Sequence, residues 1–287
     1  MIPDQKHLRS WIGRTQTEEE FVSPRLARQL AATLDYEHSP STGDVLPPLW
    51  HWALFPHISP QSQLGPDGHP PRGGFLPPIS LPRRMWAGSR VRFERCINVG
   101  SHVTRTSQIL DVAHKEGRSG SLIFVRLRHE LEDEKGSLIS EEQDVVYREA
   151  ASNPYVAADG PKAPTSWTWQ REIKPDALLL FRYSADTFNG HRIHYDRTYA
   201  IRQEGYPALV VHGPLIATLL VDLVRRCLPG ATLSSFSFKA VSPLFDNEPF
   251  YIHAARVSDS REVRLWAANA AGVLCVDATA VLGVSRP

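Results

Sequence analysis

Residues 178–228 gather more groups able to transfer protons than any other stretch of the chain: His191, His194 and His212, with Asn189 beside them. Because the unperturbed pKa of imidazole lies near neutrality, a histidine can both accept and donate a proton at physiological pH. The stretch therefore predicts acid–base chemistry.

A largely buried helix is expected directly after His212. Apolar residues recur at helical spacing over residues 215–227. Pro214 suits the first turn, where a missing N–H is no loss, and residues 229–230, Pro-Gly, end the helix. A helix that starts at Gly213 directs free N–H groups and the positive end of its dipole toward the histidine-rich segment before it.

The motif FNGHRIHYDRTYA, followed by VVHGPLIATLL, resembles the hydratase motif of the MaoC-like (R)-specific hydratase family, which has the hot dog fold. The family motif, S-G-D-x-N-P-[IL]-H, supplies an aspartate and, five residues later, a histidine; an HG pair then opens the central helix. His194 matches the family histidine and Gly213 the glycine of the helix start. Asn189 stands where the aspartate is expected, while His191 and Arg192 replace the family's Asn and Pro.

The variant N-G-H-R-I-H-Y-D is similar to that of a double hot dog subgroup of dehydratases, which RRMWAGSRVRFE, VTRTSQILDV and EEQDVVYRE also resemble. The resemblance implies an α+β double hot dog fold, with two antiparallel sheets each wrapped around a central helix. It also implies a hydro-lyase that adds water to itaconyl-CoA or mesaconyl-C4-CoA, giving citramalyl-CoA. No cofactor is implied beyond the CoA of the substrate.

Hydration of an unsaturated thioester needs a base for the water, an acid for the α-carbon and donors for the enolate oxygen. The resemblance makes His194 both base and acid. Asn189 cannot accept a proton, so we expect it to position the water. The thioester oxygen is expected at the N–H of Gly213 or of Leu215, since Pro214 has none.

Arginines near the motif could bind a substrate carboxylate or the phosphates of CoA, because the guanidinium group pairs bidentately with both. The candidates are Arg192, inside the motif, with Arg197 and Arg84. The alternative for each is an exposed surface charge.

The other histidines have alternative interpretations. His191 either contacts the substrate or orients Asn189 and the backbone, and His212 is expected to cap the helix. The HxxH spacing of His191 and His194 would suit a metal, but without a further Cys or His cluster nearby we expect none.

Two carboxylates close to the motif, Asp186 and Asp196, could replace the missing aspartate. The alternative is that they are solvated or paired with Arg192 and Arg197.

The chain divides into two expected halves. Residues 1–150 contain a possible helix-capping signal at 15–21, the helical segment PRLARQLAATLD, a Pro-rich insertion and an antiparallel strand meander from Arg90. Residues 151–165 are typical of a linker. Residues 166–287 repeat the order of strand, helix and four strands. Only this half has the motif, so we expect one active site, with the amino-terminal half as a wall of the substrate tunnel.

The Pro-rich insertion, residues 38–82, cannot be regular helix. Its aromatic residues Trp50, Trp52 and Phe55 are expected either to anchor the loop in the core or to form a lid wall over an acyl chain.

Composition is that of an ordinary globular protein: 287 residues, 42% hydrophobic and 22% charged. The net charge of +1 argues against a nucleic-acid partner or a polybasic membrane surface. The three cysteines lack metal-ligand spacing, and the amino terminus has no apolar signal core. We expect a cytoplasmic protein that binds a CoA thioester, with a homodimer as one possible assembly.

Three other functions stay open. A hot dog thioesterase would hydrolyse similar substrates without needing the hydratase motif. A noncatalytic acyl-CoA-binding protein would be consistent with an amide in place of the acid at Asn189. An (R)-3-hydroxyacyl thioester dehydratase would act on fatty acyl chains held by a carrier protein.

Overall fold

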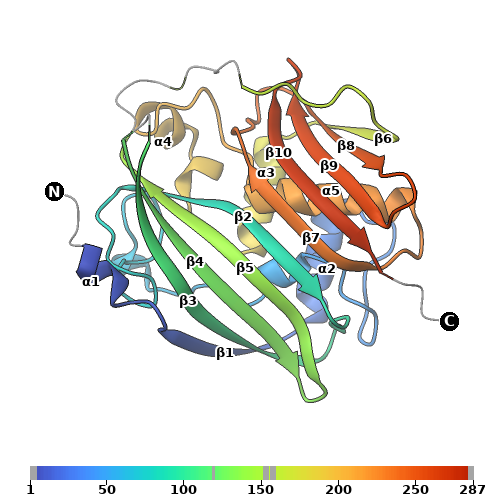
Figure 1. Ribbon diagram of the computed structural model, residues 1–287, viewed down its shortest axis with the longest axis horizontal. Helices are drawn as coiled ribbons and strands as arrows, with labels where there is room; N and C mark the ends of the chain where they lie inside the picture. Colours follow the sequence, from blue (N-terminus) through green and yellow to red (C-terminus); the bar gives the residue numbers. More distant parts are fainter. Residues whose placement is uncertain (1–4, 118–119, 151–154, 156–159, 284–287) are drawn as a thin grey trace.

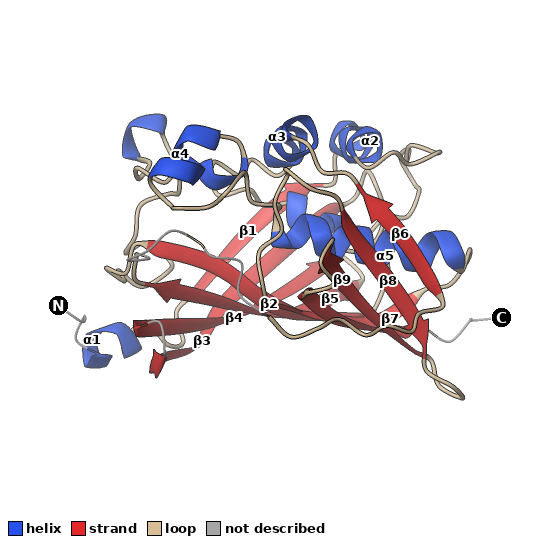
Figure 2. Ribbon diagram, turned by 90° about the horizontal axis from the view of Figure 1, so that it is seen from above, coloured by secondary structure: helices blue, strands red, loops and turns tan. Residues whose placement is uncertain are grey.

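The computed structural model describes residues 5–117, 120–150, 155 and 160–283. Within these residues, ten strands form one continuous antiparallel sheet in the order β1-β3-β4-β5-β2-β7-β10-β9-β8-β6. The sheet curls, and the helices α2, α3 and α5 lie on its concave side (Figures 1 and 2). None of the helices in this part of the chain has the length and apolar character needed to cross a membrane.

The amino-terminal half contributes five strands and two helices. They are α1 (Gln5–Arg9), β1 (Thr15–Phe21), α2 (Pro24–Thr33), β2 (Arg83–Phe93), β3 (His102–Gly117), β4 (Gly120–Asp133) and β5 (Gly136–Arg148). The Pro-rich insertion between α2 and β2 contains only the short 3-10 helices η1 (Trp50–Ala53) and η2 (Gln61–Gln63).

The carboxy-terminal half contributes the other five strands and the longest helix. Its elements are β6 (Trp169–Ile173), α3 (Ala177–Asp186), η3 (Arg192–His194), α4 (Arg197–Arg202), α5 (Gly213–Cys227), β7 (Leu233–Ala240), β8 (Phe250–Arg256), β9 (Glu262–Asn269) and β10 (Leu274–Leu282). Of the expected linker, 151–154 and 156–159 lie outside the described residues; Leu274 N–H donates to Pro161 O at 2.8 Å.

The expected pair of separate sheets is wrong, because β2 and β7 pair across the middle and join the halves. Five residue pairs hold this junction, from Gly88 opposite Lys239 to Arg92 opposite Ser235. Both strands would otherwise present unpaired edges at the centre of the molecule, and their pairing satisfies those backbone groups.

Two local expectations also need correction. Residues 15–21 form the edge strand β1, paired with β3, rather than a helix-capping signal; α2 is instead capped by Ser23, whose side chain accepts from Arg25 N–H. The strands β3, β4 and β5 form the meander, but β2 lies between β5 and β7 and does not contact β3 as a neighbour.

The main hydrophobic core spans both halves, with α5 in the middle. Leu215, Ala217 and Leu220 of α5 are fully buried. They belong to the same cluster as Leu30 of α2 and Val91 of β2. A helix that is apolar around most of its circumference must be covered on more than one side. The curled sheet covers one side of α5, and α2 and α3 lie on the other (Figure 2).

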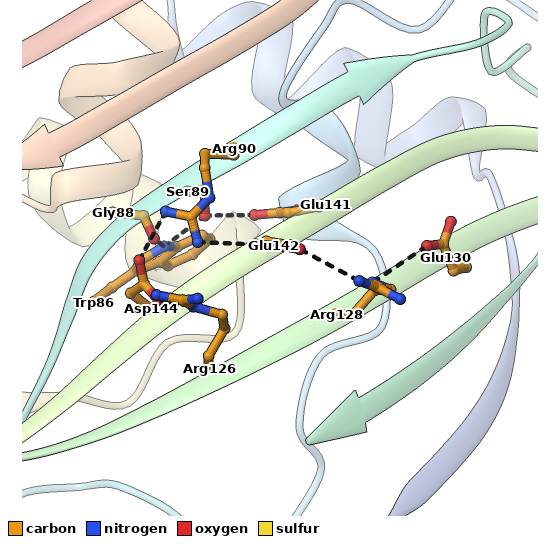
Figure 3. A network of polar contacts seen from close by, with 10 residues as sticks. All are labelled: Trp86, Gly88, Ser89, Arg90, Arg126, Arg128, Glu130, Glu141, Glu142 and Asp144. Carbon is orange, nitrogen blue, oxygen red and sulfur yellow. Dashed lines mark hydrogen bonds and ion pairs between the residues drawn. The ribbon is translucent and has the colours of Figure 1, made fainter. Parts of the chain in front are cut away.

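Alternation along β2 and β5 sends polar residues to opposite faces of the sheet. On the inner face, Ser89 Oγ donates to Glu141 Oε1 at 2.6 Å. On the outer face, Arg90 bonds to Asp144 and Glu142 at 2.9 and 3.2 Å (Figure 3). The outer ladder is exposed, whereas Glu141 is a buried carboxylate.

The junction between β2 and β7 depends on a glycine. A Cβ added at Gly88 would lie 2.3 Å from Phe238 O, so the two central strands would have to separate. We expect Gly88→Ala to lower the free energy of unfolding by about 2 kcal/mol, as overpacking does, measured by urea denaturation. Gly74→Ala is the matched control, because its Cβ would meet nothing within 4 Å. Equal stability of both variants would contradict this role of the junction.

Candidate active site

A cavity of about 640 Å³ lies between the two halves. Its walls come from the inner face of β3, β4 and β5, the Pro-rich insertion, the motif loop and the first turn of α5. Trp52 and Phe55 of the insertion line it, whereas Trp50 is 2% exposed in the core. The insertion therefore serves both as an anchor and as a wall.

His194 is buried at this cavity, on the 3-10 helix η3, with 7% of its surface exposed. Its Nδ1 lies 2.7 Å from the carbonyl oxygen of Val210. A carbonyl can only accept, so Nδ1 carries the proton and Nε2 is left as an acceptor. The geometry presets His194 as a neutral base.

The two other motif histidines surround this ring. His212 stacks on His194 with ring centroids 3.7 Å apart, and His191 meets it edge-on at 5.3 Å. His212 occupies the N-cap position of α5, but its side chain makes no capping hydrogen bond; Nε2 is paired with Ser184 Oγ at 2.9 Å instead. His212 therefore stands at the N-cap position, as expected, but its side chain does not cap the helix.

Burial keeps these three imidazoles neutral. Desolvation lowers the pKa of His194 to about 4, against which the bond to Val210 O acts weakly. Desolvation, followed by the charges that neighbouring histidines would carry, lowers the pKa of His191 and of His212 well below the ordinary value. At neutral pH the site therefore holds bases without net charge.

Asn189 lines the cavity next to these rings. Its Oδ1 accepts the backbone N–H of His191 at 3.0 Å, and its own N–H donates to Ser184 O at 2.8 Å. The amide therefore fixes the turn that carries His191, and its NH₂ group remains to meet the contents of the cavity.

The start of α5 faces the cavity through Gly213 and Pro214. In the described part of the chain no acceptor bonds to the N–H of Gly213 or of Leu215, while Ile216 N–H donates to His212 O. The Leu215 side chain lies in the core and does not line the cavity. Gly213 is the better placed donor for a negatively charged oxygen.

The three candidate arginines differ in their surroundings. Arg192 bonds to Asp196 Oδ2 at 2.7 Å, and Arg197 bonds to Asp246 Oδ2 at 2.5 Å. Neither of them lines the cavity, whereas Arg84 of β2 does. No hydrogen-bond or ion-pair partner of the Arg84 side chain occurs among the described residues.

Neither of the two carboxylates close to the motif lines the cavity. Thr33 Oγ1 donates to Asp186 at 2.7 Å. Asp196 pairs with Arg192 and caps α4 by accepting the N–H of Tyr199. The expected pairing with an arginine of the motif is confirmed for Asp196 alone, since Asp186 bonds to Thr33 and Arg197 pairs with Asp246.

A second histidine unit, which the sequence reasoning missed, comes from the Pro-rich insertion. His69 lines the cavity, and its ring centroid lies 4.1 Å from that of His191. Asp67 Oδ2 lies 2.9 Å from His69 Nδ1, and Asp67 Oδ1 accepts the His69 backbone N–H at 3.0 Å. Side-chain ligand atoms of Asp67, His69 and His191 all lie within 4.8 Å of one another.

Buried Glu141 lines the cavity on the side of the amino-terminal half. Burial raises the pKa of Glu141, but hydrogen bonds, first that of His51, outweigh burial and lower it to about 2. The bonding distances are 3.2 Å to His51 Nε2, 3.0 Å to Trp52 Nε1 and 2.6 Å to Ser89 Oγ. This carboxylate is ionised and fully partnered.

Comparison with known proteins agrees with these features. The family model for hydroxyacyl-thioester dehydratase type 2 matches residues 49–246. Mesaconyl-C(4)-CoA hydratase of Chloroflexus aurantiacus is 44% identical over 275 residues, which cover 96% of this chain and 97% of that protein.

Solved structures share the fold at low sequence identity. A MaoC-like dehydratase of Phytophthora capsici superposes with a TM-score of 0.68 at 15% identity, covering 99% of this chain and 100% of that one. A conserved Mycobacterium tuberculosis protein described as having a double hot dog fold gives 0.58 at 14% identity, with 95% and 96% covered. The fold is therefore the α+β hot dog fold, here with its strands in one sheet.

The matched family model and the extended identity lead to one conclusion: the chain belongs to the MaoC-like hydroxyacyl-thioester dehydratase family, whose members are hydro-lyases.

Proposed function

We propose that the protein hydrates a C5 dicarboxylyl-CoA, mesaconyl-C4-CoA or itaconyl-CoA, to citramalyl-CoA. The observation that carries the choice of a dicarboxylyl group is Arg84, an arginine that lines the cavity and whose side chain has no hydrogen-bond or ion-pair partner in the described chain. The name of the relative at 44% identity supports the same choice.

Arg84 differs from the other arginines of the cavity. Arg72 donates to three backbone carbonyls, Arg105 pairs with Glu18 at 2.5 Å, and Arg148 bonds to Tyr206 Oη at 3.4 Å. The charge of Arg84 contributes to lowering the pKa of His69 and of His191, so the guanidinium lies within electrostatic reach of both. A substrate carboxylate would complete its pairing.

His194 supplies the proton chemistry in this proposal. Its Nε2 removes a proton from water as the water oxygen bonds to the β-carbon, and the π electrons move to the thioester oxygen. The same Nε2 then returns the proton to the α-carbon on the same face. Stacked, neutral His212 and the carbonyl of Val210 hold the ring in one orientation throughout.

The enolate oxygen is assigned to the N–H of Gly213, at the positive end of α5. Asn189 presents its NH₂ group to the cavity and fixes the turn that carries His191. For mesaconyl-C4-CoA the double bond is conjugated to the thioester, so hydration is direct. For itaconyl-CoA an isomerisation would come first: His194 would remove a proton from the α-carbon to give a dienolate at the same oxygen site, and a proton would then be added at the γ-carbon.

The first test is His194→Ala. We expect the rate of water addition to mesaconyl-C4-CoA, followed by absorbance and mass, to fall by about 1000-fold, within the range of general acid–base catalysis. His38→Ala, at an exposed histidine far from the motif in sequence, is the control and should keep full activity. Undiminished turnover by His194→Ala would contradict the proposed role.

The acid limb of the pH profile is a second test. His194 acts unprotonated, and burial lowers its pKa to about 4. A lowered pKa keeps the base form dominant as the pH falls, so kcat/KM should hold from pH 7 to about 5 and decline near pH 4. Activity regained after return to pH 7 would exclude unfolding. An acid limb near pH 6.5 would count against His194 as the base.

Replacing the unpaired arginine tests the acyl group. Arg84→Met should lower kcat/KM for mesaconyl-C4-CoA by about 100-fold, the loss of one charge-assisted pair, and leave that for crotonyl-CoA within about threefold. Arg92→Met is the matched control, because Arg92 lies on the same strand and is exposed. Equal losses on both substrates would indicate a structural role. A wild type that turns over crotonyl-CoA alone would favour a fatty-acyl dehydratase.

A further inference from the structure

We propose that Asp67 and His69, from the Pro-rich insertion, form with His191 the side of the active site that holds the attacking water. This inference rests on the proposed hydration. It assigns to residues of the amino-terminal half a role in holding the water, at a site where the family motif supplies an aspartate.

Asn189 cannot take the role that the aspartate of the family motif has toward the water. An amide neither accepts a proton nor carries charge, and Oδ1 of Asn189 is already occupied by the His191 N–H. Asp186 and Asp196, the nearby carboxylates in the sequence, do not line the cavity. The second acceptor for water must therefore come from another segment.

The insertion is fixed to the motif loop at this point. Asp67 O accepts the Arg192 N–H at 2.9 Å, and Pro66 O accepts from Arg192 Nη1 at 2.9 Å. Gly68 has a φ of +83°, and a Cβ there would lie 1.9 Å from Gly190 O. Only glycine permits this approach, so the backbone places His69 against His191 by construction.

Hydrogen bonding sets the proton positions of His69. Burial raises the pKa of Asp67, but the bonds from His69 outweigh burial and lower it to about 2, so Asp67 is a carboxylate that only accepts. His69 Nδ1 is then the donor, and Nε2 is a free acceptor. A carboxylate behind an imidazole also raises the basicity of its far nitrogen.

The spacing suits one water molecule. Two hydrogen bonds of about 2.8 Å to a single water place the bonded nitrogens about 4.5 Å apart. The ring centroids of His69 and His191 lie 4.1 Å apart, and one nitrogen of each ring lies within 4.8 Å of the other, so one water molecule can reach both rings. The His191 side chain has no hydrogen-bond partner in the described part of the chain, so it is available for the water.

The resulting arrangement accounts for every site on the water. One O–H donates to His69 Nε2, and the other gives its proton to His194 Nε2. His191 donates an N–H to one lone pair, and the second lone pair forms the new bond to the β-carbon. His69 and His191 keep their protons. The proton on His194 passes to the α-carbon as the enolate returns to the thioester carbonyl.

The experiment compares His69→Ala and Asp67→Asn with Gln63→Ala, an exposed residue of the same insertion that does not line the cavity. We expect kcat for hydration to fall about 100-fold in His69→Ala and about 10-fold in Asp67→Asn, as loss of water positioning predicts. The KM and the Kd of saturated methylsuccinyl-CoA should stay within threefold. Added imidazole should restore part of the kcat of His69→Ala alone.

Several results would overturn the inference. Loss of analogue binding without imidazole rescue would make Asp67 and His69 merely structural. Full kcat in His69→Ala, with His194→Ala inactive, would sink the inference and leave the proposed function intact. Loss of wild-type activity on chelation, with recovery on adding Zn²⁺, would make the three residues a metal site. A wild type inert toward mesaconyl-C4-CoA, itaconyl-CoA and crotonyl-CoA would remove the proposed function too.

Discussion

The hydrogen bond from His194 Nδ1 to the carbonyl oxygen of Val210 is the contact on which the rest of the site depends. It fixes the tautomer and the plane of the ring on which His212 stacks. Val210 is itself held, because its N–H donates to Ile193 O at 3.0 Å and it bridges to Phe245. Val210 thus ties the motif loop, the segment before α5 and the loop between β7 and β8 to the orientation of a single nitrogen.

The amino-terminal half matters because of how the sheet closes. Pairing of β2 with β7 places the inner face of β3, β4 and β5 opposite the motif loop, and the Pro-rich insertion spans the gap between them. A chain with one motif therefore still builds a cavity with two different sides. One side carries the motif histidines, and the other carries Arg84, the paired Glu141 and the insertion with His69.

The sequence predicted the parts that depend on local periodicity. The helix at 213–227 was predictable because its apolar spacing, Pro214 and the Pro-Gly stop all act locally, and His194 was found through a contiguous motif. Partner choice between strands is not encoded in alternation, so the junction of β2 with β7 escaped prediction. His69 escaped too, because it lies far from His191 in sequence, in a loop without any period; the one local signal is the turn sequence Asp67-Gly68-His69.

The amide of Asn189 and the unpaired guanidinium group of Arg84 both favour a negatively charged acyl group. For the dicarboxylyl substrate that we propose, a carboxylate at 189 would repel the substrate's own by about 3 kcal/mol at 5 Å and an effective dielectric constant of about 20. The described carboxylates that line the cavity, Glu18 and Glu141, are each paired, to Arg105 and His51. Asp67 does not line the cavity, and its carboxylate is bonded to His69 and lies within 4.8 Å of a His191 nitrogen. In our assignment the acid acts through the imidazole of His69. The Arg84 side chain has no hydrogen-bond or ion-pair partner in the described part of the chain, which favours an anionic acyl group over a neutral one.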